Sequence, residues 1–450
     1  MKTGARAVRN FGITLGVLGL VALSACSEKE VILPGERLDI REALDETATP
    51  EPVAPRSAQN RSEGISLPAA QSNASWTQRI GSTNARTLHP ALSANPQVIW
   101  TANIGAGDAR RARITADPVV ADGRIFTMDS ESRVTAVSTS GQVLWSQDLV
   151  PPTDKAKDAT GGGLAYGDGK LFASTGFGIL SALDPATGAE IWQQKLRETG
   201  SGTPAVRDGL VYIVGGDQTG WALDTDTGRV VWELTGTPDA KNVLGAPMPA
   251  VSDEYVVFSF GEGELRGAFR QGGLQMWNAL LSGQRIGVAR TNIDDVTGDP
   301  VIVGDTVYVG SYSGRLVALG LANGERKWTA DEGALSAVWP VGGSLFLVSD
   351  RNELLRVDAE TGERIWGAEL PYFVNRKPKR QMRVYAHYGP VVAGGLVRVA
   401  SDDGLLRSFN PEDGSLAGTS AIPAGATTNP VVAGGVLYVV NAKGQLLALR

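Results

Sequence analysis

Residues 180–192 read LSALDPATGAEIW, and residues 222–232 repeat the pattern as ALDTDTGRVVW. In both copies an Asp precedes a Thr-Gly pair by three residues, and a Trp follows the Gly by four. An Asp side chain can close a turn over the residues that follow it, and Gly accepts the left-handed backbone conformation that such a turn requires. We therefore expect a strand, a tight turn and a second strand that carries the Trp.

The same Trp position recurs along most of the chain. It is occupied at residues 100, 145, 192, 232, 277, 328 and 366, at intervals of 38 to 51 residues. Most units open with a Pro before an apolar strand, as in Asp117–Val119 and Asn429–Val431, and a turn pair such as Gly434–Gly435 then precedes an aromatic strand. Each unit thus holds about four strands. Repeats of about 40 to 50 residues with four strands each are typical of a β-propeller.

The positions of the repeats predict both the number of blades and the way in which the ring closes. They open near residues 118, 164, 204, 249, 300, 340, 390 and 430, which gives eight blades. The last unit ends at Arg450 after its third strand, whereas Val98–Thr101 carries a Trp-position strand without three strands before it. We predict an all-β, eight-bladed propeller of four-stranded blades, closed by this N-terminal strand, which removes both open sheet edges. The seventh unit departs from the rule, with Gly418 in the Trp position.

The composition excludes several classes of function. The 450 residues carry a net charge of −6, which argues against a nucleic-acid-binding protein. A single Cys forbids an intramolecular disulfide and a Cys-cluster metal site, and the two His residues, His89 and His387, have no partner at ligand spacing. We read both as structural and predict no catalytic, cofactor-binding or metal-binding residues.

The N-terminus has the form of an export signal. Basic residues precede an apolar run from Phe11 to Leu23, which is too short for a membrane-spanning helix. Leu23–Cys26 (LSAC) resembles a bacterial lipobox, so Cys26 is the predicted lipidation site, with an ordinary signal peptide as the alternative. Ser27, in place of an aspartate, favours the outer membrane by the same resemblance. We expect a lipid-anchored protein that faces the periplasm.

The domain organisation follows from composition. Residues 27 to about 75 are rich in Glu, Ala, Pro, Ser and Arg and show no sustained period, which predicts a flexible spacer. We assign residues 1–25 to a lipoprotein signal peptide, 26–80 to the lipidated Cys and a periplasmic tether, and 81–450 to the propeller.

Over residues 95–450 the array resembles the pyrroloquinoline-quinone-type propeller repeat. One family with this repeat comprises quinoprotein dehydrogenases, and this resemblance leaves a periplasmic quinone-dependent dehydrogenase as an alternative. Their usual adjacent-cysteine disulfide is impossible here. The other family is the lipoprotein subunit of the outer-membrane β-barrel assembly machinery, which has a lipobox, a spacer and one eight-bladed propeller. That resemblance implies a non-catalytic scaffold. Its expected partners are the periplasmic domains of the core barrel subunit and nascent outer-membrane proteins. No cofactor is expected.

The resemblance to the assembly family also implies partner contacts in two loops, before the fourth and fifth blades. The first loop matches residues 242–247, where Val243 and Leu244 are the candidate contacts although the family's arginine is absent. The second matches residues 293–300, where Asp294 and Asp295 are candidates and Thr297 replaces a second acidic residue. Leu244 could instead be a buried blade-entry residue, and the two aspartates could instead cap a turn.

Two further features leave their function open. Residues 376–383 (RKPKRQMR) form a basic connection between the sixth and seventh blades, either a solvated loop or a patch for anionic headgroups or an acidic partner. A polysaccharide-binding or lyase propeller is a third functional hypothesis, which would require aromatic platforms or a carboxylate pair in a cleft.

Overall fold

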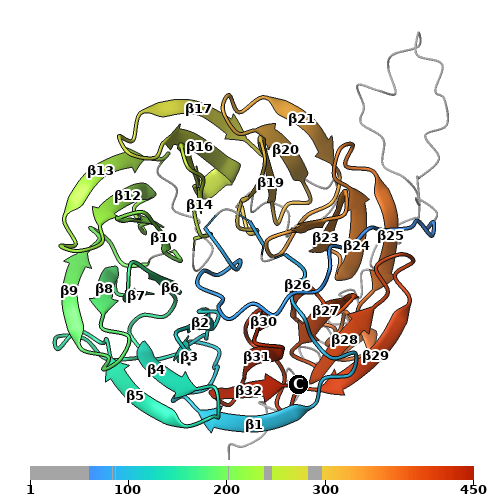
Figure 1. The fold of residues 1–450 in the computed structure, drawn as a ribbon, viewed down its shortest axis with the longest axis horizontal. Coiled ribbons are helices and arrows are strands. Elements are labelled where there is room, and N and C mark those ends of the chain that lie inside the picture. Colours follow the sequence, from blue (N-terminus) through green and yellow to red (C-terminus); the bar gives the residue numbers. More distant parts are fainter. Residues whose placement is uncertain (1–59, 84, 87, 201, 238–245, 282–295) are drawn as a thin grey trace, which may run out of the picture. The chain divides into compact units, whose positions relative to one another are not determined.

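The computed structural model describes residues 60–450 except 84, 87, 201, 238–245 and 282–295. Chain contacts divide the protein into two units, Met1–Ser57 and Ala58–Arg450, and the second unit holds all of the described residues. Its strands form eight separate four-stranded antiparallel sheets, arranged as blades in a ring (Figure 1). The predicted all-β, eight-bladed propeller is confirmed.

Each of the first seven blades uses four consecutive strands, ordered from the axis outward. Blade one contains β2 (Val119–Ala121), β3 (Arg124–Met128), β4 (Arg133–Ser138) and β5 (Val143–Asp148). Blade two contains β6 (Leu164–Gly167), β7 (Lys170–Thr175), β8 (Ile179–Leu183) and β9 (Glu190–Lys195). Blade three contains β10 (Ala205–Arg207), β11 (Leu210–Val214), β12 (Thr219–Asp224) and β13 (Val230–Thr235). Blade four contains β14 (Ala250–Val251), β15 (Tyr255–Ser259), β16 (Glu264–Phe269) and β17 (Gln275–Leu280), with the short 3-10 helix η1 (Gly261–Gly263).

The second half of the ring repeats this order. Blade five contains β18 (Val301–Val303), β19 (Thr306–Gly310), β20 (Leu316–Gly320) and β21 (Arg326–Ala330). Blade six contains β22 (Trp339–Val341), β23 (Ser344–Val348), β24 (Glu353–Asp358) and β25 (Arg364–Glu369). The 3-10 helix η3 (Pro378–Arg380) precedes blade seven, which contains β26 (His387–Ala393), β27 (Leu396–Ser401), β28 (Leu405–Phe409) and β29 (Leu416–Ala421). Blade eight contains β30 (Val431–Ala433), β31 (Val436–Asn441), β32 (Gln445–Leu449) and β1 (Val98–Asn103).

The N-terminal strand closes the ring as the sequence predicts. β1 pairs with β32 in antiparallel register, with Trp100 opposite Ala448 and Asn103 opposite Gln445. The backbones of Gln97 and Arg450 exchange hydrogen bonds of 2.8 and 2.9 Å just beyond the strands. Every sheet therefore has four strands, and the last blade joins residues from opposite ends of the described chain.

The predicted Asp-x-x-Thr-Gly turn forms between the third and fourth strands. In blade two, the Oδ1 atom of Asp184 accepts hydrogen bonds from the backbone of Ala186 at 2.8 Å and of Thr187 at 2.9 Å. The Thr187 hydroxyl donates to the same oxygen at 3.0 Å, and Gly188 follows with φ 78°. Asp224 and Asp358 repeat these contacts in blades three and six. The carboxylate thus accepts hydrogen bonds from backbone N–H groups of the turn that have no partner in a neighbouring strand.

The recurring Trp joins one blade to the next at seven of the eight junctions. The Trp192 indole N–H donates to the carbonyl of Thr225 in blade three at 3.0 Å. A Cβ atom on Gly228, in the turn of blade three, would lie only 2.6 Å from the Trp192 ring. The ring therefore packs directly against the backbone of a residue that has no side chain. The Trp thus packs against the next blade and bonds one of its carbonyls. The same pairing joins Trp100 to Gly141, Trp145 to Gly188, Trp232 to Gly273, Trp277 to Gly324, Trp328 to Gly362 and Trp366 to Gly414.

Residues 60–95, which we call the strap, cross one end of the ring. This end carries the turns between the first and second strands of the blades, and Figure 1 shows the strap in blue across the centre. The backbones of Trp76 and Val120 exchange two hydrogen bonds of 2.8 Å, and Tyr166 donates to Thr77 at 2.8 Å. The strap also bonds residues of the other six blades, at Val206, Val251, Asp299, Ala337, Gly394 and Gly434.

Part of the strap lies within the residues that the sequence analysis assigns to the tether. The sequence places the tether at residues 26–80, whereas the compact unit starts at Ala58 and residues 60–80 belong to the strap. Its lack of a period of 2 or 3.6 has a physical reason. The strap bonds the ends of blades one residue at a time and forms no continuous sheet or helix, so neither regular period is required.

Candidate functional site

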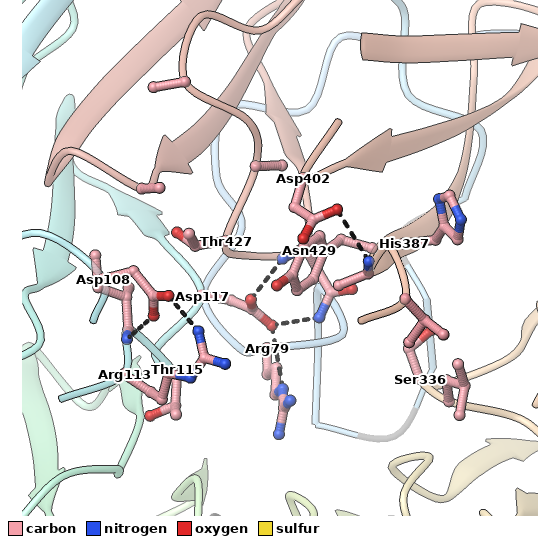
Figure 2. A pocket seen from close by; sticks show the side chains of 18 of the residues that line it. Arg79, Asp108, Arg113, Thr115, Asp117, Ser336, His387, Asp402, Thr427 and Asn429 are labelled. Atoms are coloured by element: carbon pink, nitrogen blue, oxygen red, sulfur yellow. Dashed lines mark hydrogen bonds and ion pairs between the residues drawn. The ribbon is translucent and has the colours of Figure 1, made fainter. Parts of the chain in front are cut away.

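A cavity of about 710 Å³ lies at the centre of the end opposite the strap, which we call the loop face. The connections that link consecutive blades meet on this face and line the cavity. Lining residues come from the connections before blades one, two, three, six, seven and eight, including Thr115, Gly162, Thr203, Ser336, Ala386 and Thr427. Figure 2 shows these connections converging on the hollow. The topology therefore gathers residues that are hundreds of positions apart into one polar site.

The floor of the cavity is a charge network built around Arg79 of the strap. The Nε atom of Arg79 donates to Asp117 at 3.1 Å, and Nη1 lies 3.4 Å from Oδ1 of Asp299 (Figure 2 draws the Asp117 contact). Asn429 donates its backbone and side-chain N–H groups to Asp117 at 2.7 and 2.8 Å. Thr203 accepts a further long hydrogen bond from Arg79 at 3.4 Å. One arginine thus connects blades one, three and five through the axis.

Burial and pairing act in opposite directions on this network. Burial by itself lowers the pKa of Arg79, but the nearby Asp299 and Asp117 carboxylates outweigh it, and the pKa rises. Burial raises the pKa of Asp117, against the opposing effects of Arg79 and Asn429. A buried charge without a partner is costly, so the arginine and the two carboxylates stabilise one another and hold the strap on the axis.

The cavity wall carries a second set of polar groups. Arg113 pairs with Asp108 at 2.5 Å, and Asp402 accepts a hydrogen bond from the backbone of Ala386 at 3.0 Å. Burial raises the pKa of Asp402 and lowers that of His387. Burial also raises the pKa of Tyr388. These groups are held by the seventh and eighth blades and by the connection into blade one.

Both histidines are held by structural hydrogen bonds. The ring nitrogens of His387 lie 2.6 Å from the Ser401 hydroxyl and 2.8 Å from the Pro371 carbonyl. His89 contacts the Pro68 carbonyl at 2.6 Å and accepts from the backbone of Gly395 at 2.8 Å. Within the described residues, no group of three or more His, Cys, Asp or Glu side chains could hold a metal ion. The cavity therefore offers paired charges and hydroxyl groups for polar contacts.

The predicted contact and anchor residues, Cys26, Val243, Leu244, Asp294 and Asp295, lie outside the described residues. The described flanks of the two predicted contact loops can nevertheless be placed. In the described end of the first loop, the Ala246 carbonyl accepts a hydrogen bond at 3.3 Å from the backbone of Thr203, which lines the cavity. In the described end of the second, the Thr297 hydroxyl donates to the Ala334 carbonyl at 2.7 Å, next to the lining residue Leu335. Both connections therefore return to the ring on the loop face.

Sequence reasoning missed the residues of the cavity floor, although a signal was present. Four of the repeated openings have a polar residue directly before the Pro, namely Asp117, Thr203, Asp299 and Asn429. These residues precede the innermost strands and meet at the axis. The sequence shows the repeated position, but not that Arg79, from the presumed tether, would complete the network.

The family of the chain follows from sequence comparison. The family model for the outer membrane protein assembly factor BamB matches residues 130–368 and 377–450, more than half of the chain. The chain belongs to the BamB family. It is 27% identical over 361 residues to the BamB of Shewanella oneidensis, which covers 78% of this chain and 88% of that protein. The Yersinia pestis BamB is 22% identical and covers 79% of this chain and 88% of its own length.

Solved structures support the fold. The crystal structure of BamB from Moraxella catarrhalis matches with a TM-score of 0.64 and 18% identity, over 79% of this chain and 99% of that one. A quinohemoprotein alcohol dehydrogenase from Comamonas testosteroni reaches a TM-score of 0.63 at 16% identity, over 84% of this chain and 81% of that one. The propeller is thus common to BamB proteins and quinoproteins, and the sequence family separates the two.

Proposed function

We propose that the protein is a non-catalytic scaffold of the outer-membrane β-barrel assembly complex. It binds the periplasmic domains of the core barrel subunit and assists insertion of nascent outer-membrane proteins. Membership of the BamB family carries this proposal. A ring with every blade closed supports it, because rigid sheets present connecting loops in fixed positions for partner binding.

We propose that Cys26 is lipidated and anchors the protein to the outer membrane with the propeller in the periplasm. The lipobox-like residues before Cys26 motivate this assignment. No helix among the described residues is both long and apolar enough to cross a membrane. Replacement of Cys26 by Ala should move the protein from the membrane fraction to the soluble periplasmic fraction. Retention of the variant in the membrane fraction would contradict the anchor.

We further propose that the partner contacts lie in the two loops that contain Val243 and Leu244, and Asp294 and Asp295. The described flanks of both loops lie on the loop face, which supports one shared docking surface. An apolar contact and an acidic contact would suit a partner surface that combines a pocket with positive charge.

The experiment that tests this proposal is co-purification of the core barrel subunit with a double variant, Leu244→Asp with Asp295→Arg. We expect recovery of the core subunit to fall at least about tenfold, because the new charges oppose both contacts. The matched control is Ile191→Asp with Glu360→Arg, two exposed sites outside the two loops. The control should retain the partner. Equal recovery with both variants would remove the proposed contact residues, and failure of the unmodified protein to retain the core subunit would remove the function.

A further inference from the structure

The connection between β25 and β26, residues 371–386, forms a two-stranded arm, and its second strand contributes to the cavity lining. The backbone of Val374 donates to the Arg383 carbonyl at 3.0 Å, and Tyr385 donates to Tyr372 at 2.8 Å. A β-bridge joins Phe373 and Val384, and η3 forms the tip. The match to the family model is interrupted at residues 369–376, at the base of this arm.

The arm carries a net positive charge, whereas the rest of the protein is net negative. It contains five Lys or Arg residues and no Asp or Glu, so the net charge of −6 for the whole chain leaves −11 for the remainder. Four of them, Arg376, Lys377, Lys379 and Arg380, are exposed, and no hydrogen bond or ion pair of their side chains to another described residue is found. Only Arg383 has a carboxylate partner within the described part, Asp402 at 3.6 Å. The arm therefore presents a local positive field.

Apolar side chains accompany these charges. Met382 is 94% exposed between the basic residues, and Phe373, Val374 and Val384 are also exposed on the arm. Basic residues mixed with exposed apolar residues are typical of segments that bind the interface of an anionic membrane, because charge attracts the segment and the apolar groups enter the headgroup region. A purely solvated loop would not require the apolar side chains.

A second basic connection lies on the same face. Arg110 and Arg111 are exposed in the connection from β1 to β2, whose neighbouring residue Arg113 lines the cavity together with Arg383 of the arm. Exposed cations therefore occur both on the arm and on this connection, while Arg113 and Arg383 are each paired with an aspartate, Asp108 and Asp402.

The described chain begins beside the arm. Asn60 bonds the carbonyl of Gly367 at 2.8 Å, and the backbone of Arg61 donates to Ile365 at 3.0 Å. Both partners belong to β25, the strand that leads into the arm. In the sequence, the 33 residues from Ser27 to Gln59 separate Cys26 from Asn60. The described chain therefore starts at blade six, the blade that directly precedes the arm.

We propose that the arm binds the surface of a bilayer containing anionic phospholipid, as a second membrane contact besides the lipid anchor. The role of the arm as a second contact rests on the proposed anchor, but binding by the arm itself does not, so the two can be tested separately.

The test is vesicle co-sedimentation of the mature chain with Cys26→Ser, which cannot be lipidated. The vesicles contain phosphatidylcholine alone or with about a third of phosphatidylglycerol. We expect binding to the anionic vesicles only, weakened by raising NaCl from about 50 to about 300 mM. Reversal of the four exposed arm charges to Glu should weaken binding at least about 100-fold, since each cation contributes separately near an anionic surface. Met382→Ser should weaken it a few-fold.

The matched control reverses four exposed cations on other blades, Lys155, Lys157, Lys195 and Arg229, with the same change in net charge. It should bind anionic vesicles at least about tenfold more tightly than the arm variant. Equal binding of the parent chain to both vesicle types, or equal loss in both charge variants, would overturn the proposal. If the arm variant instead lost the core subunit without any change in vesicle binding, the arm would be a contact for an acidic protein and the membrane proposal would be wrong.

Discussion

The junction between blades six and seven differs from the junction between blades seven and eight. At the first, Trp366 of β25 is fully buried, packs on Gly414 and donates its N–H to the Pro411 carbonyl at 3.0 Å. At the second, Gly418 of β29 takes the Trp position, opposite Ser408, which itself lies opposite Arg398. The other junctions have a Trp at this position. The junction between blades seven and eight has Gly418 there, and the buried Arg398 lies two strands away in the same row of the sheet.

The arginine joins the seventh blade to the segment that leads into β1. Arg398 is fully buried, and its guanidinium donates to the carbonyls of Ala94 at 2.7 Å and Ser93 at 2.9 Å, as well as to Ser408. The reason lies in the next blade. A Trp on β29 would need a turn glycine between the third and fourth strands of blade eight, but those strands, β32 and β1, are not joined by a turn. The comparison shows that Trp and Gly act as a pair across the junction.

Replacement of Trp366 by Ala should have the largest effect. It removes a fully buried indole and leaves a cavity against Gly414, for an expected loss of about 4 kcal/mol in the free energy of unfolding. Urea denaturation monitored by circular dichroism measures this loss. A loss below about 1 kcal/mol would show that the Trp position does not hold neighbouring blades together.

Replacement of Arg398 by Met should cost about 3 kcal/mol, because it removes the donor to the Ser93 and Ala94 carbonyls and leaves the buried Ser408 hydroxyl without its partner. The loss should be accompanied by faster amide exchange in β1, since this contact holds the segment before that strand. Hydrogen exchange of β5 provides the internal control, and equal acceleration in both strands would contradict a local role for Arg398 in closing the ring.

Replacement of Gly414 by Ala tests the glycine half of the pair. Its φ is 73°, and an added Cβ would lie 2.6 Å from the Trp366 ring, so we expect a loss of about 2 kcal/mol. The matched control is Gly395→Ala in the same blade, with φ 78° and no atom within 4 Å of the new Cβ. The control should lose only about 1 kcal/mol, from backbone strain alone. Equal losses would mean that the Trp ring moves aside without cost.

The smallest expected effect is on the pH dependence of blade seven. Burial lowers the pKa of His387 below its usual 6.5. The unfolded chain therefore binds a proton at a higher pH than the folded chain, so stability is fully present above about pH 6.5 and falls as the pH drops below it. His387→Gln should flatten this dependence, measured as the free energy of unfolding between pH 7 and 5. An unchanged slope would assign the acid sensitivity to other groups.

The repeat positions were predictable because each depends on contacts close in sequence or repeated along it. Asp184, Thr187 and Gly188 form their turn within five residues, and the interval between Trp residues is set by one blade of four strands. The truncated last unit and the unmatched strand at Val98–Thr101 were enough to predict how the ring closes. Gly418 was recognised as an exception, but its explanation required the missing turn of blade eight.

The sequence by itself determined the number of blades, the order of their strands and the family, because these are repeated, local patterns. The tertiary structure alone decided that Arg79 meets Asp117 and Asp299 at the axis, that residues 60–80 cross the ring, and that Arg398 replaces the Trp contact at the closing junction. These contacts join residues from 38 to 361 positions apart. Nothing in the local pattern specifies such partners, since they become neighbours only when the eight sheets close around one axis.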